Sequence, residues 1–255
     1  MAIAPPIALA APPTNKAALR YSLLNAAVGP LDMPDGARLV DLRYTVPWCG
    51  PGGTAYIPEC GAFGVPEGPL DIADGFATVL ERRFECQASG FENGAQVEEL
   101  MLDRLEVSEP RLLEAALAAY LATTTAFDLG SAATMAAAVS AMETYAYTTQ
   151  GYGLTATMHL PIGAFAYLAS EYLITRESAT GVWRTNLGTI VAPNASLTDH
   201  AFITGLTVVW RAPQPFIPEA AEALDRGDNL YKMVGQRDYI VAWECFTATI
   251  ELGVL

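Results

Sequence analysis

The stretch from Arg237 to Leu252 (RDYIVAWECFTATIEL) restricts the fold more than any other part of this sequence. Its two alternating sets of positions are both rich in apolar residues: Tyr239, Val241, Trp243, Cys245 and Thr247 on one side, and Ile240, Ala242, Glu244, Phe246 and Ala248 on the other. Because successive side chains of a strand point to opposite faces, such a strand must be buried on both faces. The pattern therefore predicts one central strand over 237–252.

Other stretches have the apolar spacing of further strands and helices. The predicted strands are 38–46, 76–88, 156–160, 187–192 and 199–209. The predicted helices are 15–27, 93–121, 132–147 and 162–170. Residues 123–130 are expected to be a linker, with Ser131 as the N-cap of the helix that follows it. No repeat of 20–50 residues is present, which counts against a solenoid.

The longest predicted helix, Asn93 to Leu121, contains a proline at position 110. An apolar stripe runs along it at helical spacing, through Val97, Leu100, Met101, Leu105, Leu112, Leu113, Ala116, Leu117 and Tyr120. Serine is a good N-cap and proline is accepted in a first turn, so the simplest interpretation is that a second helix begins after Ser108. A single kinked helix is the alternative.

The segment from Pro47 to Gly68 is rich in glycine and proline and should not form regular secondary structure. It is longer than ordinary connections, which rarely exceed about 12–15 residues, so we expect it to be functional or packed against a neighbouring chain. It contains Cys49 and Cys60, for which free thiols are expected, with a disulfide as the alternative in an oxidising environment. It has neither a lysine nor a phosphate-loop motif, which excludes a nucleotide site of that type.

Composition favours surfaces buried between subunits over the binding of nucleic acid or membrane. Apolar residues make up 52% of the chain and charged residues only 16%, which is little charge for a free monomer. An ordinary alanine-rich globular protein is the alternative. With a net charge of −14 and two lysines, tight binding to nucleic acid is not expected. The apolar runs are shorter than the roughly 18 residues of a membrane span. We expect residues 1–13 to be an extended arm, not an export signal, because no basic residue precedes the apolar segment.

Residues that could carry chemistry are few. His159 lies inside an apolar strand and is expected to be a packed, hydrogen-bonded side chain, while His200 follows Asp199 in a loop. Cys49 lies in a W-C-G-P sequence without the second cysteine of redox motifs. The acidic residues between 98 and 106 are expected to be a solvated helix face. We therefore expect no catalytic residue, no cofactor and no metal site. An enzyme that uses Cys49 or His159 is the alternative.

Two groups of residues carry a resemblance to a known family. In the stretch 151–196, a hydrophobic–His–hydrophobic–Pro strand and a helix are followed by a T-x-L-G-x-x-V sequence formed by Thr185, Leu187, Gly188 and Val191. Near the end of the chain, a D-R-x-x-N turn precedes an R-x-Y-x-V-x-W-x-C strand, with the matching residues Asp225, Arg226, Asn229, Arg237, Tyr239, Val241, Trp243 and Cys245. The first group resembles the core of tailed-phage capsid proteins of the Hong Kong 97 type, and the second is similar to small capsid proteins of actinobacterial phages. Together they cover 84–252.

This resemblance implies an α+β fold with an N-terminal arm, an extended loop, a peripheral domain with a long spine helix, and an axial domain. On this sequence the implied parts are an arm at 1–37, an extended loop and strand region at 38–91, a peripheral domain with the spine helix at 92–150, an axial domain at 151–210, and a return segment with a C-terminal strand at 211–255.

The function that the resemblance implies is a major capsid protein that assembles with itself, as pentamers and hexamers, into an icosahedral shell around the phage genome. It would enclose DNA without sequence-specific binding, have scaffold, portal or decoration proteins as further partners, and involve no membrane. It would belong to the virion after assembly in the host cytoplasm. The candidate contacts between subunits are exposed arginines, namely Arg82, Arg83, Arg176 and Arg184. An encapsulin-like compartment shell and a head or tail completion protein are the alternatives.

Overall fold

The structure, a computed structural model, describes residues 22–33, 45–46, 71–72, 74–88, 93–149, 156–243 and 246–253 of the 255-residue chain. Residues 1–21 of the predicted arm (1–37), nearly all of the predicted strand 38–46, the segment 47–68, and the cysteines at 49, 60 and 245 lie outside these ranges. Within the predicted extended loop and strand region (38–91), two short strands, β2 (Thr45–Val46) and β3 (Asp71–Ile72), form an antiparallel pair.

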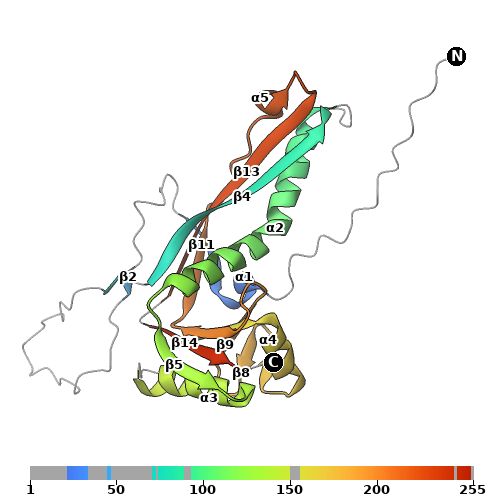
Figure 1. The fold of residues 1–255 in the computed structure, drawn as a ribbon. Helices are drawn as coiled ribbons and strands as arrows, with labels where there is room; N and C mark the ends of the chain where they lie inside the picture. The colour runs from blue at the N-terminus through green and yellow to red at the C-terminus, as the bar shows by residue number, and fades with distance from the viewer. Residues whose placement is uncertain are drawn as a thin grey trace, which may run out of the picture.

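The larger strands belong to two sheets that occupy different parts of an elongated molecule (Figure 1). The first sheet has five strands: β1 (Val28–Asp32), β4 (Asp74–Gln87), β11 (Thr207–Arg211), β12 (Leu224–Asp225) and β13 (Leu230–Trp243). Short helices α1 (Leu23–Ala26) and α5 (Ala220–Ala223) precede β1 and β12.

The centre of this first sheet is the antiparallel pair of β4 and β13, which runs from Asp74 opposite Trp243 to Gln87 opposite Leu230. The other edge of β13 pairs with β11 and β12, and β1 adds a parallel strand beyond β11. The predicted strand 76–88 is thereby confirmed as β4.

One long helix, α2 (Gly94–Thr123), packs on β4 and β13. It is continuous through Pro110, so the predicted restart is wrong and the alternative, a single kinked helix, is confirmed. Ser108 does not cap a helix; its hydroxyl donates to the carbonyl of Leu105 at 3.0 Å. Proline lacks an N–H and crowds the carbonyl four residues earlier, which accounts for the change of direction along α2 in Figure 1.

The two halves of α2 bury different faces. Before the bend, one apolar cluster joins the helix to the β4–β13 pair through Val97, Met101, Leu105, Phe84 and Met233. After the bend, a second cluster joins the helix to both sheets through Leu113, Leu117, Leu121, Tyr239, Trp243, Ile190 and Phe202. At about 100° per residue, the buried helical positions of the two halves lie on different sides. The single apolar stripe read from the sequence therefore describes this helix only in part.

The second sheet has seven strands in the order β5 (Phe127–Ala132), β14 (Thr247–Leu252), β10 (His200–Thr204), β6 (Thr157–Pro161), β9 (Ile190–Asn194), β8 (Trp183–Thr185) and β7 (Ile174–Arg176). Helix α3 (Met135–Thr144), extended by a π-helical turn η3 (Tyr145–Thr149), packs on β5 and β14, and α4 (Ile162–Ser170) packs on β6 and β9. The predicted strand 156–160 and helix 162–170 are confirmed as β6 and α4.

Three local predictions around this second sheet are wrong. Residues 123–130 are not a linker, because they contain the first part of β5, an edge strand too exposed to show an apolar pattern. The N-cap of α3 is Thr134 instead of Ser131, since the Thr134 hydroxyl accepts the amide of Ala137 at 3.2 Å. The strand expected from residue 187 begins only at Ile190, because Gly188, with φ of 97°, lies in a turn.

Two strands predicted as continuous are each divided between the sheets. The stretch 199–209 forms β10 in the seven-stranded sheet and β11 in the five-stranded sheet, and 237–252 forms β13 and β14. The alternation does not reveal the breaks, because the chain is buried before and after each of them. The breaks are marked instead by polar side chains. Thr207 donates its amide to the Thr157 hydroxyl at 3.2 Å, and the Trp243 indole donates to the Thr247 hydroxyl at 2.8 Å.

Candidate functional site

His159 lies in β6 at the junction of the two sheets and is fully buried. Its Nε2 is 3.1 Å from the hydroxyl oxygen of Thr204, which in turn is 3.1 Å from that of Thr207. Burial lowers the pKa of His159 from 6.5 to about 4, so the ring is neutral at neutral pH. The interpretation of this residue as a packed, hydrogen-bonded histidine is confirmed.

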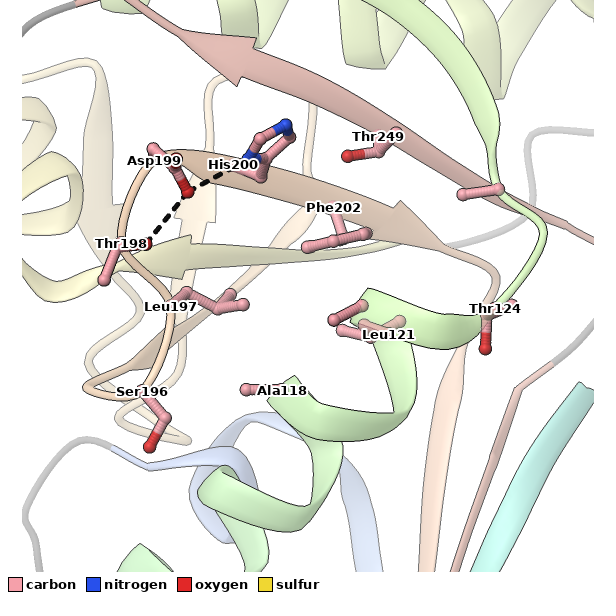
Figure 2. A pocket seen from close by; sticks show the side chains of 12 residues that line it. Ala118, Leu121, Thr124, Ser196, Leu197, Thr198, Asp199, His200, Phe202 and Thr249 are labelled. Atoms are coloured by element: carbon pink, nitrogen blue, oxygen red, sulfur yellow. Dashed lines mark hydrogen bonds and ion pairs between the residues drawn. The ribbon is translucent and has the colours of Figure 1, made fainter.

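His200 borders a pocket of about 380 Å³ between the last turns of α2 and the loop before β10 (Figure 2). Its Nδ1 is 3.0 Å from the Asp199 carboxylate, which also accepts the Thr198 hydroxyl at 2.9 Å. These hydrogen bonds lower the pKa of Asp199. Ser196 lies at the far end of the loop from His200 in Figure 2. A nucleophile has to be hydrogen-bonded to its base, and the hydrogen bonds of these two described residues join Ser196 to Asn194 and His200 to Asp199 instead.

The T-x-L-G-x-x-V sequence forms a turn held by a buried carboxylate. Glu143 of α3 is 8% exposed and accepts hydrogen bonds from the hydroxyls of Thr185 and Thr189, the latter at 3.0 Å. The Thr185 hydroxyl also accepts the Thr189 amide at 3.2 Å. Leu187 projects into solvent at the tip of the turn, and Val191 packs in the core. The motif therefore ties α3 to β8 and β9, and its polar residues serve structure.

Two of the four candidate arginines hold their own hairpin together. Arg176 donates through Nε to the carbonyl of Gly181 at 3.2 Å. Arg184 donates to the carbonyl of Gly188 at 3.0 Å and forms an ion pair of 3.3 Å with Glu177. Hydrogen bonds from Thr180 and Arg184 lower the pKa of Glu177. Within one chain, both guanidinium groups thus stabilise the hairpin of β7 and β8.

The other two candidates, Arg82 and Arg83, are neighbours in β4 and are both exposed. Side chains alternate along a strand, so Arg82 shares the face of Leu80 and Phe84, which packs towards α2. Arg83 points to the opposite face, with Glu81 and Glu85. The four arginines predicted from the sequence therefore lie on two separate parts of the molecule.

A buried ionic cluster at the bend of α2 was not predicted. Glu109, 3% exposed, lies 2.9 Å from a guanidinium nitrogen of Arg237, which is 5% exposed. The Tyr239 hydroxyl donates to the same carboxylate at 2.9 Å. Burial and the Glu109 charge raise the pKa of Tyr239. One sequence signal could have found this cluster, because Arg237 shares the buried face of β13 with Tyr239 and Trp243 and so needs a buried anion.

Large apolar side chains are exposed mainly around the seven-stranded sheet. Five of the nine such side chains among the described residues lie there, namely Phe127, Ile162, Tyr167, Tyr172 and Leu187, with Tyr172 82% and Leu187 65% exposed; the other four are Leu31, Val79, Val107 and Phe216. Ile162 and Tyr167 lie on α4, whose exposed positions carry no charge. Uncharged, apolar surface of this kind is typical of surfaces that contact another protein.

Metal and membrane features were also sought within the described ranges. No group of three or more histidine, cysteine, aspartate or glutamate residues there is arranged to hold a metal ion. No described helix is long and apolar enough to span a membrane.

Comparison with known proteins identifies the fold. No protein-family model and no curated protein matches the chain. Among solved structures, the capsid of an empty GTA particle superposes with a TM-score of 0.56 at 10% identity, covering 92% of this chain and 90% of that one. A structure from Gordonia phage Cozz superposes with a TM-score of 0.53 at 12% identity, covering 91% and 85%.

The chain therefore has the fold of a phage-type capsid protein. The predicted class, an α+β fold of the Hong Kong 97 type with a long spine helix, is confirmed, with α2 as that helix.

Proposed function

We propose that this chain is a major capsid protein, many copies of which assemble into the icosahedral shell that encloses a phage genome. The observation that carries the proposal is its structural likeness, over about nine-tenths of both chains, to the capsid of the GTA particle. A protein of this function works by self-association, which places it in the virion and requires no catalytic site.

The surface of the subunit supports self-association. The exposed apolar side chains around α4 and the β8–β9 turn would be buried between neighbouring copies, which removes apolar area from water. The net charge of −14 supports a wall that does not adhere to the nucleic acid inside it.

The two sheets suggest where the domains divide. We propose that the seven-stranded sheet with α3 and α4 is the axial domain and that the five-stranded sheet with α2 is the peripheral domain. Compared with the axial domain expected at 151–210, this division assigns β11 to the peripheral domain and adds β5 and β14 to the axial domain. The reason is that strands are grouped by their pairing and not by their order in the chain. Arg82 remains a candidate contact on the face of β4 that packs towards α2, whereas we propose no contact for Arg83 on the opposite face. Arg176 and Arg184 remain candidates through the hairpin that they hold in shape.

The test is the assembly state of the full-length chain expressed alone. Sedimentation velocity and negative-stain electron microscopy should show closed shells or capsomer-sized rings at high protein concentration and with a crowding agent. A chain that remains a 27.1 kDa monomer under all of these conditions would contradict the proposal. Rings that never close would point instead to a head or tail completion protein.

A further inference from the structure

The exposed surface of α2 before and at its bend is divided by charge into two flanks. The acidic flank consists of the exposed Glu99 and Glu106 and the half-buried Asp103. The basic flank consists of Arg104 and Arg111 together with Arg82 of the neighbouring strand β4. At about 100° per residue, the α2 residues of the two flanks are separated by roughly a third of a full rotation around the helix axis. The two charges therefore point to different sides of the subunit.

The basic flank lies along the seam between α2 and β4. The Arg104 guanidinium lies 4.4 Å from the centre of the Phe84 ring, which places it over β4. Arg82 is two positions from Phe84 and on the same face of the strand. Arg111 follows Arg104 by two helical turns, with Val107, 45% exposed, between them. Among the described strands, β4 pairs only with β13, so no described strand pairs with its outer edge beside this flank.

The acidic flank lies towards β13 and α5, on the other side of the helix. Glu98, next to it, accepts the amide of Ala220 at 2.8 Å, which fixes this side of α2 against α5. The Glu106 carboxylate is 3.9 Å from Arg237 and its side chain is 53% exposed. Glu99 is exposed two turns earlier. The negative charge of this flank is thus displayed on a rigid surface.

The charge balance of the whole chain determines how this separation of charges affects the association of copies. The sequence has 28 acidic residues and only 14 basic ones, so copies of the chain repel one another unless cations are placed where copies meet. Two of those cations, Arg82 and Arg104, lie at the seam between α2 and β4, and Arg111 continues the exposed basic side of the helix as far as Glu114, with which it interacts. The side of α2 with the acidic flank complements this seam in charge.

We propose, on the basis of the proposed shell function, that the basic flank of one copy docks against the acidic flank of the next copy. The two surfaces differ, so the contact is heterologous and repeats in one direction, as a closed ring of subunits requires. Complementary charges of this kind set the register and the rate of association more than its final strength. The partner is therefore a second copy of this chain, approached edge to edge along α2.

The experiment reverses each flank separately in the full-length chain. The first variant, Arg82→Glu with Arg111→Glu, makes both flanks acidic. The second, Glu99→Arg with Glu106→Gln, leaves the acidic flank without net charge, because the new arginine offsets Asp103. Assembly is measured by sedimentation velocity and electron microscopy beside wild type, and thermal melting shows that each variant is folded. The matched control is Arg83→Glu, the neighbouring arginine on the opposite face of β4.

We expect each variant alone to form at least about tenfold fewer particles than wild type, because the first brings like charges together and the second removes the attraction. A one-to-one mixture of the two should form more particles than either variant alone, since contacts between the two variants include the native pairing of flanks that neither variant can form with itself. Arg83→Glu should assemble as wild type does. Wild-type yields from the first variant, equal loss from Arg83→Glu, or a mixture that fails although both variants are folded would each overturn the docking. Failure of wild type itself to assemble would refute the shell function instead.

Discussion

Replacing Glu109 by alanine should destabilise the subunit more than almost any other single substitution on α2. The carboxylate is the nearest anion to the buried Arg237 guanidinium, at 2.9 Å, and it accepts the Tyr239 hydroxyl at 2.9 Å. The next carboxylate, Glu106, is 3.9 Å away and half exposed. Without Glu109, a charge that is 5% exposed loses its partner in a part of the core that water does not reach.

The expected cost is about 3–5 kcal/mol, the usual penalty for leaving one member of a buried ion pair uncompensated. A chain of this size loses roughly 2–4 °C of melting temperature per kcal/mol, so the midpoint should fall by about 6–20 °C. Arg237→Met should cost a similar amount, because it leaves the carboxylate buried instead. The triple variant Glu109→Met, Arg237→Met and Tyr239→Phe removes every polar member, and we expect it to lie within about 2 kcal/mol of wild type.

The assay is urea unfolding of the dilute, unassembled chain followed by circular dichroism. The free energies of the two single variants and the triple variant are compared at one pH. A triple variant that loses as much stability as the two single variants combined would refute the reasoning. The cluster as a whole would then stabilise the fold, instead of its members only offsetting the cost of burying one another. Single variants within 1 kcal/mol of wild type would show that Arg237 reaches water or another anion.

Three further outcomes are expected. The pKa of His159 falls from 6.5 in the unfolded chain to about 4 in the fold, so folding favours the neutral ring. Stability should therefore be lost as pH drops from about 6.5 to 4, by about 3 kcal/mol. His159→Phe should flatten the profile of the urea midpoint against pH over that range, and an unchanged profile would contradict this role of His159. Thr185→Val removes a hydroxyl donor from buried Glu143 and should lower the free energy of unfolding in urea by about 1–3 kcal/mol. The control Thr175→Val, on the exposed face of β7, should lower it little. Equal effects of the two variants would contradict the structural role of the hydrogen bond between Thr185 and Glu143. Leu187→Ser, at a 65% exposed position, should leave the melting temperature unchanged but lower the yield of particles in electron microscopy; loss of stability instead would place Leu187 in the fold and not in a contact.

Elements with a simple apolar pattern could be predicted from the sequence. The strand β6, the helix α4 and the strand β4 have either continuous burial or clear alternation, and their predicted ranges agree with the structure within a few residues. The edge strand β5 could not be predicted, because five of its six positions are exposed or only half-buried and carry no apolar signal.

The divided strands show a limit of local patterns. Alternation reports whether a residue is buried, but not which sheet buries it, so β10 with β11 and β13 with β14 look continuous. The grouping of surface charges likewise cannot be predicted from local sequence patterns. Arg82 could be chosen from its charge, whereas the seam that it shares with Arg104 and Arg111 depends on how α2 lies on β4. Long-range placement of this kind requires the tertiary structure.

The position of β13 and β14 within the sheets has a consequence for synthesis. β13 lies between β4 and β11, and β14 lies between β5 and β10, so each is an inner strand of its sheet. Until the ribosome has released both, β4 and β11 lack the strand that joins them, and β5 is separated from the five strands β10, β6, β9, β8 and β7, which pair without β14. Nascent chains therefore cannot present the complete subunit surface to one another. Their unpaired strand edges are instead available to other incomplete chains, so crowded, simultaneously translated copies are exposed to aggregation until both strands are in place.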